Sequence, residues 1–157
     1  MLFNIICLPI CSGEIIDRVV AYVDDQAITI KDFLEFRAKI KEKLPNISSN
    51  EIIELMINRK LLLKESKKIF LEGDEEEAIK NYIDLKIKSK IFITDDKIRE
   101  YYEQNKHQFG EKPFLSIRDE IETYLFEREL NKKLIEHIKE LRELAEIKII
   151  FLPFGDY

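Results

Sequence analysis

The stretch GEIIDRVVAYVDDQAITIKDFLE, residues 13–35, changes its periodicity within a few positions. Its first half alternates in hydrophobicity and is rich in β-branched residues, which predicts a strand covered on one face and partly on the other. Asp24 and Asp25 suit a tight turn, and residues 26–28 suit a short return strand. Thr29 follows as a helix N-cap, with an acidic residue three positions later. The stretch therefore predicts a β-hairpin that leads directly into a helix.

The chain closes with a second β-like stretch, AEIKIIFLP at residues 145–153. Isoleucine or phenylalanine occupies every second position from Ile147 to Phe151, which predicts a strand. A single strand needs a partner because its backbone donors and acceptors must be hydrogen-bonded. The opening hairpin is the partner that the sequence offers. We therefore expect residues 15–23 and 146–152 to lie side by side in a small antiparallel sheet.

Helix starts are well marked between these strands. Ser48 is an N-cap with Glu three positions later, and Thr94 is an N-cap followed by two aspartates on the positive end of the helix. The first helix should end near Leu44, because Pro45 stops it. Residues 50–70 are apolar over a wide arc, which predicts the most buried helix.

A further helix is expected after Gly73, which interrupts the preceding pattern. Residues 74–77 place negative charge on its first turn, and Lys86, Lys88 and Lys90 place positive charge on its last. Both biases complement the helix dipole, so we expect this helix to run to Lys90.

The last predicted helix is the longest. Apolar residues recur at mostly three- and four-residue spacing from Pro113 to Ala145. At 1.5 Å per residue this helix spans on the order of 45 Å, which exceeds what a compact domain of this size needs. We therefore expect an elongated, mainly α molecule with an arm or an open groove. Its parts are a single helical domain over residues 14–152 and a tail over residues 153–157.

The composition indicates a soluble, folded protein. Hydrophobic residues make up 45% and charged residues 36% of the 157 residues, which is enough apolar content for one domain with a core. The formal net charge is −5, and the two signs are interspersed along the chain. A nucleic-acid binder would show a clustered basic face, so we expect no nucleic-acid partner.

Residues 1–13, MLFNIICLPICSG, carry no charged side chain and are too few to span a bilayer. An apolar run that ends in small residues is typical of a signal peptide, here with cleavage before Glu14, although a basic segment before the run is missing. The alternatives are a lipoprotein acylated at Cys11 and a buried N-terminal strand. We expect an export signal, whose removal would leave a chain without cysteine, since Cys7 and Cys11 both lie within it.

The sequence contains no recognisable catalytic motif. Neither GxxxxGK[ST] nor GxGxxG occurs, and His107 and His137 are thirty positions apart without a shared local motif. His137 lies in a polar helical stretch, where we expect it to be solvated rather than to bind a metal. The acidic pairs have turn and cap roles. We therefore expect no enzymatic activity, no metal and no cofactor.

Four aromatic residues surround the helix break QNKHQFGEKPF: Tyr101, Tyr102, Phe109 and Phe114. They are either ordinary core residues or part of an apolar surface for extended or unfolded polypeptide. Both alternatives stay open at this point, and the four are our candidate polypeptide-binding residues.

Four segments in this order resemble the SurA-type periplasmic chaperone family, over most of residues 14–151. IIDRVVAYVDDQAITIKDF is similar to the hairpin and first helix of the family, and ELMINRKLLLKESKKI to its second helix. ITDDKIREYYEQNKHQF resembles the segment before the peptidyl-prolyl isomerase modules. KPFLSIRDEIETYLFERELNKKLIEHIKELRELAEIKII resembles the C-terminal helix and closing strand. The order of these segments, with the hairpin beside AEIKII, is more specific than any one of them.

The chain departs from the family at one decisive point. Only Gly110 and Glu111 separate NKHQF from KPF, where parvulin-type isomerase modules usually lie. The resemblance therefore implies a chaperone core alone, which binds unfolded outer-membrane or secreted polypeptides without ATP, through an apolar groove between helices, in the periplasm. The alternatives are a scaffold for one dedicated partner or for a second copy in a homodimer, and a residual peptidyl-prolyl isomerase.

Overall fold

A computed structural model of the chain describes residues 18–71, 73–151 and 153. The described chain is mainly helical, with one small antiparallel sheet, which confirms the predicted fold class. The predicted signal segment at residues 1–13, with Cys11, lies outside the described residues, as does most of the tail. The elements in chain order are β1 (Val19–Val23), β2 (Gln26–Thr29), α1 (Ile30–Lys41), α2 (Ser49–Lys68), α3 (Glu75–Lys86), the 3₁₀-helix η1 (Lys88–Lys90), α4 (Asp95–Gln104), α5 (Lys106–Phe109), α6 (Phe114–Leu144) and β3 (Ile147–Ile149).

The sheet joins the two ends of the described chain. Its strand order is β2-β1-β3, and β1 pairs antiparallel with both neighbours. Tyr22 lies opposite Lys148, and Val23 lies opposite Ile147. The predicted pairing of hairpin and closing strand is therefore confirmed over β1 and β3, whereas residues 15–17 and 152 of the predicted strands lie outside the described residues.

The predicted helix caps form as expected. Thr29 and Ser48 each accept a hydrogen bond from the backbone N–H three residues on, and the carboxylates of Asp32 and Glu51 accept from the cap N–H in return. Thr94 caps α4 in the same way, without the return bond. These local patterns fix where three helices begin because they satisfy N–H groups that have no partner inside the helix.

Two helix ends differ from the prediction. α1 ends at Lys41, three residues before Leu44, although the Leu44 N–H still bonds to the Ile40 carbonyl. A proline disfavours helical geometry at the residue before it, which is Leu44 here. In this chain the helix already ends at Lys41. α3 ends at Lys86, and Lys88–Lys90 form a separate 3₁₀ turn. The chain then becomes extended at Ile91, so two of the three lysines predicted for the last turn lie beyond the helix.

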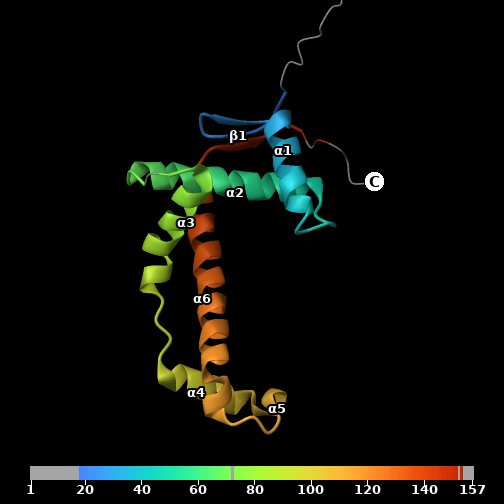
Figure 1. Cartoon of the computed structure of the whole chain (residues 1–157). Helices are drawn as coiled ribbons and strands as arrows, with labels where there is room; N and C mark the ends of the chain where they lie inside the picture. Colours follow the sequence, from blue (N-terminus) through green and yellow to red (C-terminus); the bar gives the residue numbers. More distant parts are fainter. Residues whose placement is uncertain (1–17, 72, 152, 154–157) are drawn as a thin grey trace, which may run out of the picture.

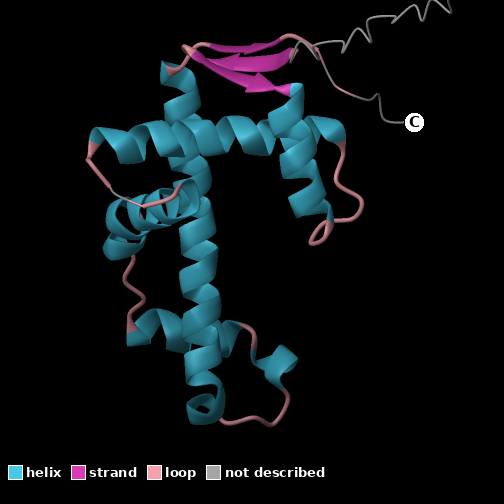
Figure 2. Cartoon of the chain, turned by 45° about the horizontal axis from the view of Figure 1, so that its top comes forward, coloured by secondary structure: helices cyan, strands magenta, loops and turns pink. Residues whose placement is uncertain are grey.

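Figure 1 shows that α6 extends between α4 and α5 at one end of the molecule, where it begins, and α2 and the sheet at the other, where it ends. With 31 residues, α6 is about 46 Å long. We call the sheet with α1, α2, α3 and the last turns of α6 the body, and α4, α5 and the first turns of α6 the tip. Figure 2 shows the sheet beyond α2, on the side away from the tip. The expected elongated shape is present.

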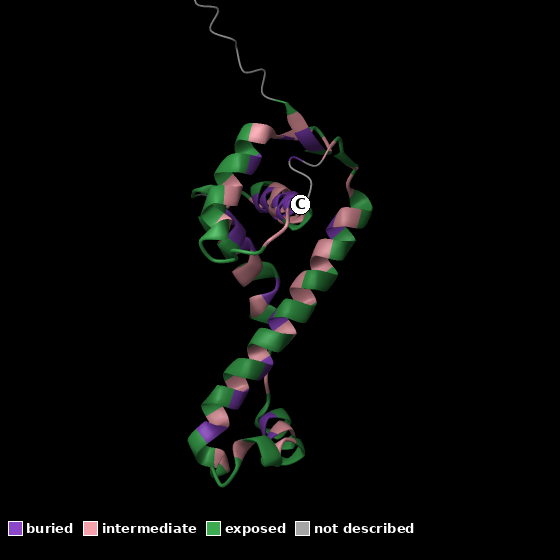
Figure 3. Ribbon diagram, turned by 90° about the vertical axis from the view of Figure 1, so that its right-hand side faces the viewer, coloured by how far each residue is buried: buried purple, intermediate pink, exposed green. Residues whose placement is uncertain are grey.

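The buried residues form separate cores along α6 (Figure 3). The body core is built around α2, which has nine buried residues, seven of them in this core, as expected for the central helix. A middle cluster of Ile87, Ile91 and Leu130 packs the end of α3 and the connecting segment against α6. The tip has its own core around Ile98 and Ile117. The tip is therefore held at a distance from the body by one continuous helix.

Asp24 joins three parts of the body. Its backbone N–H donates to the Glu146 carbonyl at 2.8 Å, and its Oδ1 accepts from the Glu146 N–H at 2.9 Å. Its Oδ2 accepts from Lys64 Nζ of α2 at 2.6 Å. Asp24 has a φ of 53°, a left-handed conformation that Asp and Asn tolerate better than most residues. We call these contacts the Asp24 junction. The sequence predicted the turn but not the partners.

We predict that Asp24→Asn lowers the free energy of unfolding by about 1–2 kcal/mol, because it removes an ionic hydrogen bond that is partly exposed to solvent. Asn keeps an acceptor for the Glu146 N–H and tolerates the positive φ. Asp24→Ala should cost about 1 kcal/mol more, since Ala provides neither. Thermal melting of the three proteins checks this order. Equal melting temperatures for all three would contradict the role of the junction.

The junction should also weaken in acid. The Lys64 ammonium and the Glu146 N–H lower the pKa of the Asp24 carboxyl below its ordinary value of 3.8. Because the folded-state pKa is the lower one, the carboxylate stabilises the fold above the ordinary value, and this contribution is lost as the pH falls through the folded-state pKa. The difference in melting temperature between the wild type and Asp24→Asn should be largest near pH 7 and shrink below about pH 4. A difference that stays constant down to pH 2 would contradict this assignment.

Candidate functional site

The four aromatic candidates from the sequence come together in the tip. Tyr102 is buried and packs with Ile98 of α4 and with the buried side chains of α6. Tyr101, Phe109 and Phe114 pack around this core and remain partly exposed. The structure thus places all four in one cluster, and their binding of polypeptide stays a prediction.

Tyr102 organises this cluster. Its ring stacks on Phe109, with centroids 5.7 Å apart and an interplanar angle of 13°, and meets Phe114 edge-on at 5.5 Å. Its hydroxyl donates to the Lys112 carbonyl at 2.9 Å. Through these contacts α4 holds α5 and the turn that leads into α6. Gly110 in that turn has a φ of 61°, where a residue without Cβ is favoured. Tyr102 therefore acts first as a structural residue of the tip.

Tyr101 contacts Phe109 as well, with ring centroids 6.3 Å apart, and it also contacts α6. Its ring lies 5.3 Å from that of Tyr124, and the Arg128 guanidinium lies over both rings at 5.8 and 5.7 Å. Burial, together with a hydrogen bond to Tyr124, raises the pKa of the Tyr101 phenol, which stays neutral at physiological pH. This face of Tyr101 borders open space.

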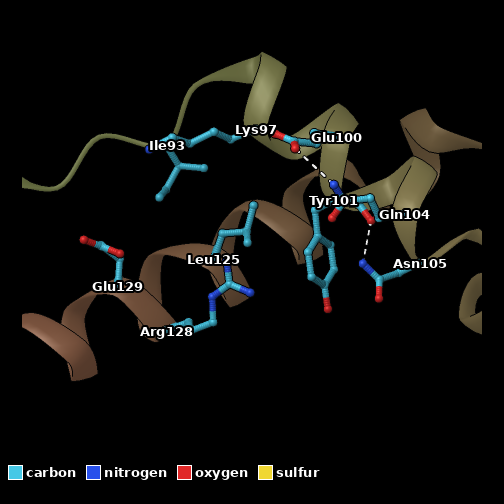
Figure 4. Close-up of a pocket in the computed structure, with 9 residues that line it drawn as sticks. All are labelled: Ile93, Lys97, Glu100, Tyr101, Gln104, Asn105, Leu125, Arg128 and Glu129. Atoms are coloured by element: carbon cyan, nitrogen blue, oxygen red, sulfur yellow. Dashed lines mark hydrogen bonds between the residues drawn. The ribbon is translucent and has the colours of Figure 1, made fainter.

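A groove of about 480 Å³ lies between α4 and α6 at this point (Figure 4). Its volume lies in the range of pockets that take small molecules or a few side chains of a peptide. We call it the α4–α6 groove. Its lining residues are Ile93, Lys97, Glu100, Tyr101, Gln104, Asn105, Leu125, Arg128 and Glu129.

An ion pair joins the two walls of the groove outside its lining. Arg118 of α6 bonds to the Asp95 carboxylate at the start of α4, and also to Asp119 and Glu122 of its own helix. These hydrogen bonds, that to Asp95 first, raise the pKa of the guanidinium further above an already high value. Asp95 also lies where the helix dipole favours negative charge. This pair adds to the packing of the tip core, which holds α4 against α6.

A second, shallower groove of about 330 Å³ lies between α3 and α6. Ile79, Ile83, Leu130 and Leu134 give it an apolar floor, and Lys88 pairs with Asp84 at its rim at 2.9 Å. It lies nearer the body than the α4–α6 groove, along the same long helix. α6 therefore borders two open concave surfaces.

The sequence led us to expect a solvated His137, whereas the structure shows it only partly exposed. It is half-buried, its Nε2 lies 2.8 Å from the Tyr82 hydroxyl, and the two rings stack at 5.8 Å. Its Nδ1 lies 3.6 Å from the Glu140 carboxylate. The polar pattern around His137 in its own helix did not indicate its partner Tyr82, which lies on α3. His107 lies exposed on α5.

Among the described residues, no group of three or more His, Cys, Asp or Glu side chains is placed to hold a metal ion. Within the same residues, no helix is both long and apolar enough to cross a membrane.

Comparison with known proteins gives no match of any kind: no family model, no curated protein and no solved structure matches this chain. The class of protein that the fold defines is a mainly helical body with a small terminal sheet and a projecting helical tip. The candidate site is defined by its own residues and geometry.

Sequence reasoning found Tyr101 but missed Tyr124 and Arg128, which complete its surroundings. Tyr124 falls on the apolar stripe expected for the last helix, whereas its side chain is half-exposed beside the Tyr101 ring. Arg128 follows Tyr124 by four positions, a spacing that places both on one helical face. That spacing was the available signal, but it does not show which part of α4 lies opposite.

We predict that Tyr102→Ala lowers the free energy of unfolding by about 3 kcal/mol, since it removes a buried ring and its hydrogen bond. Tyr124→Ala should cost less than half as much, because Tyr124 is half-exposed. Chemical denaturation measures both. Amide hydrogen exchange should show that Tyr102→Ala increases opening of α4 and α5 more than opening of α2. Equal costs for the two variants would contradict the structural role of Tyr102.

Proposed function

We propose that this protein is an ATP-independent chaperone that holds unfolded polypeptides, with the α4–α6 groove as its main contact site. The observation that supports this proposal best is the position of the groove. It is concave and lies beside partly exposed aromatic rings, at the end of a 31-residue helix that separates it from the body core. A segment of an unfolded chain can enter such a groove without any rearrangement of the body.

Exposed apolar side chains elsewhere on α6 support holding at several points. Leu115, Ile135 and Leu144 are 83%, 69% and 86% exposed, and lie near the start, middle and end of the helix. Each contributes little by itself, and ordering a flexible client offsets much of the gain. Weak contacts spread along an arm favour rapid exchange of the client, which suits a holding function.

The proposed cycle uses no nucleotide. The sequence contains no phosphate-binding loop of the GxxxxGK[ST] type. Release then follows when the client folds or is inserted elsewhere. The proposed clients, unfolded outer-membrane or secreted proteins, and the proposed periplasmic location follow from the resemblance to SurA-type chaperones. Attachment through a lipid on Cys11 is the alternative to a free exported protein.

We also propose that the protein is not an enzyme. The resemblance implies isomerase activity only through modules for which this chain has two residues, Gly110 and Glu111. A protease-coupled assay of prolyl isomerisation should therefore show the uncatalysed rate, and a rate above it would favour the residual isomerase instead. A scaffold for one partner, or for a second copy, is the other alternative.

We predict that the protein suppresses the aggregation of several chemically unfolded, unrelated proteins at comparable molar ratios, with and without ATP. Light scattering measures this. Suppression of a single protein, with none for the others, would favour the dedicated scaffold and contradict the general chaperone.

A photo-cross-linking amino acid tests the location of the site. At Gln104, which lines the groove, it should capture unfolded client. At Glu120, an exposed position of the same tip outside the lining, it should capture much less. Equal capture at both positions would contradict the assignment of the groove, even if aggregation is suppressed.

A further inference from the structure

We infer that the α4–α6 groove selects client segments with an acidic side chain next to apolar residues, and that the Arg128 guanidinium binds that carboxylate. This inference rests on the proposed function and adds to it the chemistry of the bound segment. The ligand is an internal Asp or Glu side chain of an extended polypeptide.

The first support is the way in which Arg128 is held. Its guanidinium lies over the rings of Tyr101 on α4 and Tyr124 on α6. These two contacts position it without an ion pair. Contact through the ring faces leaves the planar N–H edge of a guanidinium available. That edge has the geometry to donate two parallel hydrogen bonds to one carboxylate.

The second support is the balance of charge in the groove. Its lining carries two cations, Arg128 and Lys97, and two carboxylates, Glu100 and Glu129. Glu100 accepts a hydrogen bond from Gln104 at 3.0 Å, and Glu129 pairs with Lys133 at 3.7 Å. Neither cation has an ion-pair partner within the described residues, as the ion pairs of this region involve other side chains. The lining is therefore neutral overall, but Arg128 and Lys97 lack an ion-pair partner among the described residues and can bind a carboxylate from a client.

Some of the other arginines share this state: Arg18 also lies over a ring, that of Phe151 at 4.8 Å, without an ion-pair partner within the described residues. Arg59, Arg118 and Arg142 each pair with a carboxylate at 2.9 Å or less. Arg99 also lies over a ring, that of Phe114 at 4.8 Å, but it does not line the groove. Arg128 combines an aromatic support, a missing carboxylate and a place inside a concave surface.

Two residues of the lining account for the preference for apolar neighbours. Ile93 and Leu125 provide an apolar floor next to the Tyr101 ring. A segment that alternates apolar and acidic residues can place one side chain on this floor and the next on Arg128. We take the ligand to be an internal side chain and not the chain terminus, because an unfolded client has many acidic side chains but one C-terminal carboxylate.

Two blocked peptides test the inference. Both are acetylated and amidated nonapeptides, one with a central Glu between leucines and the other with Gln in its place. Titration of the full-length protein, followed by NMR, gives the two dissociation constants. The wild type should bind the Glu peptide about fivefold more tightly, as expected for a partly exposed bidentate pair.

The variants assign this preference to one side chain. Arg128→Gln should bring the ratio of the two dissociation constants close to one, and Arg128→Lys should retain only part of it, since an ammonium lacks the planar fork. Arg99→Gln is the matched control, because it removes an aromatic-supported arginine outside the groove, and it should leave the ratio unchanged. Melting curves establish that all three variants are folded.

The outcomes separate this inference from the proposed function. Equal binding of the two peptides by the wild type, or a preference that survives in Arg128→Gln, would overturn the inference and leave the chaperone proposal intact. Failure of the wild type to bind either peptide at millimolar concentration would contradict both. A Gln peptide with a free C-terminus that binds as tightly as the Glu peptide, through Arg128, would overturn the choice of an internal side chain.

Discussion

The structure depends on the hydrogen bonds that Asp24 makes to the closing strand and to the central helix. One carboxylate receives the Glu146 N–H and the Lys64 ammonium, while the Asp24 N–H donates to Glu146 in return. The residues joined are 122 and 40 positions apart along the chain. Because β3 follows α6 directly, this junction also fixes the end of the long helix on the body. The ion pair of Arg142 with Glu54 and the packing of Leu141 in the body core hold the same end of α6, so these contacts together set its direction.

A helix fixed at one end can project only if its other end is stable without the body. The separate tip core provides this, with Tyr102 in contact with α5 and the turn before α6. Between the two ends, the middle cluster around Leu130 holds the connecting segment against the helix. The molecule thus distributes its apolar burial over three places instead of one. The open surfaces beside α6 result from this distribution.

Those features that depend on neighbouring residues in the chain were predictable from the sequence. The caps at Thr29 and Ser48 follow from spacings of three residues, and the pairing of β1 with β3 follows from the need of each strand for a partner. Contacts between distant helices were not predictable in the same way. The partner of His137 and the surroundings of Tyr101 depend on how α3 and α4 are rotated against α6, which periodicity within one helix does not determine.

The central claim is that unfolded polypeptide binds beside α6 at the tip. The most direct measurement is an NMR titration of the isotope-labelled protein with a protein that is kept permanently unfolded. We predict that the largest chemical-shift changes occur at residues of the α4–α6 groove. Smaller changes should occur along exposed parts of α6, and the sheet should change little. Shifts confined to the sheet and α1, or none at saturating concentration, would contradict the account.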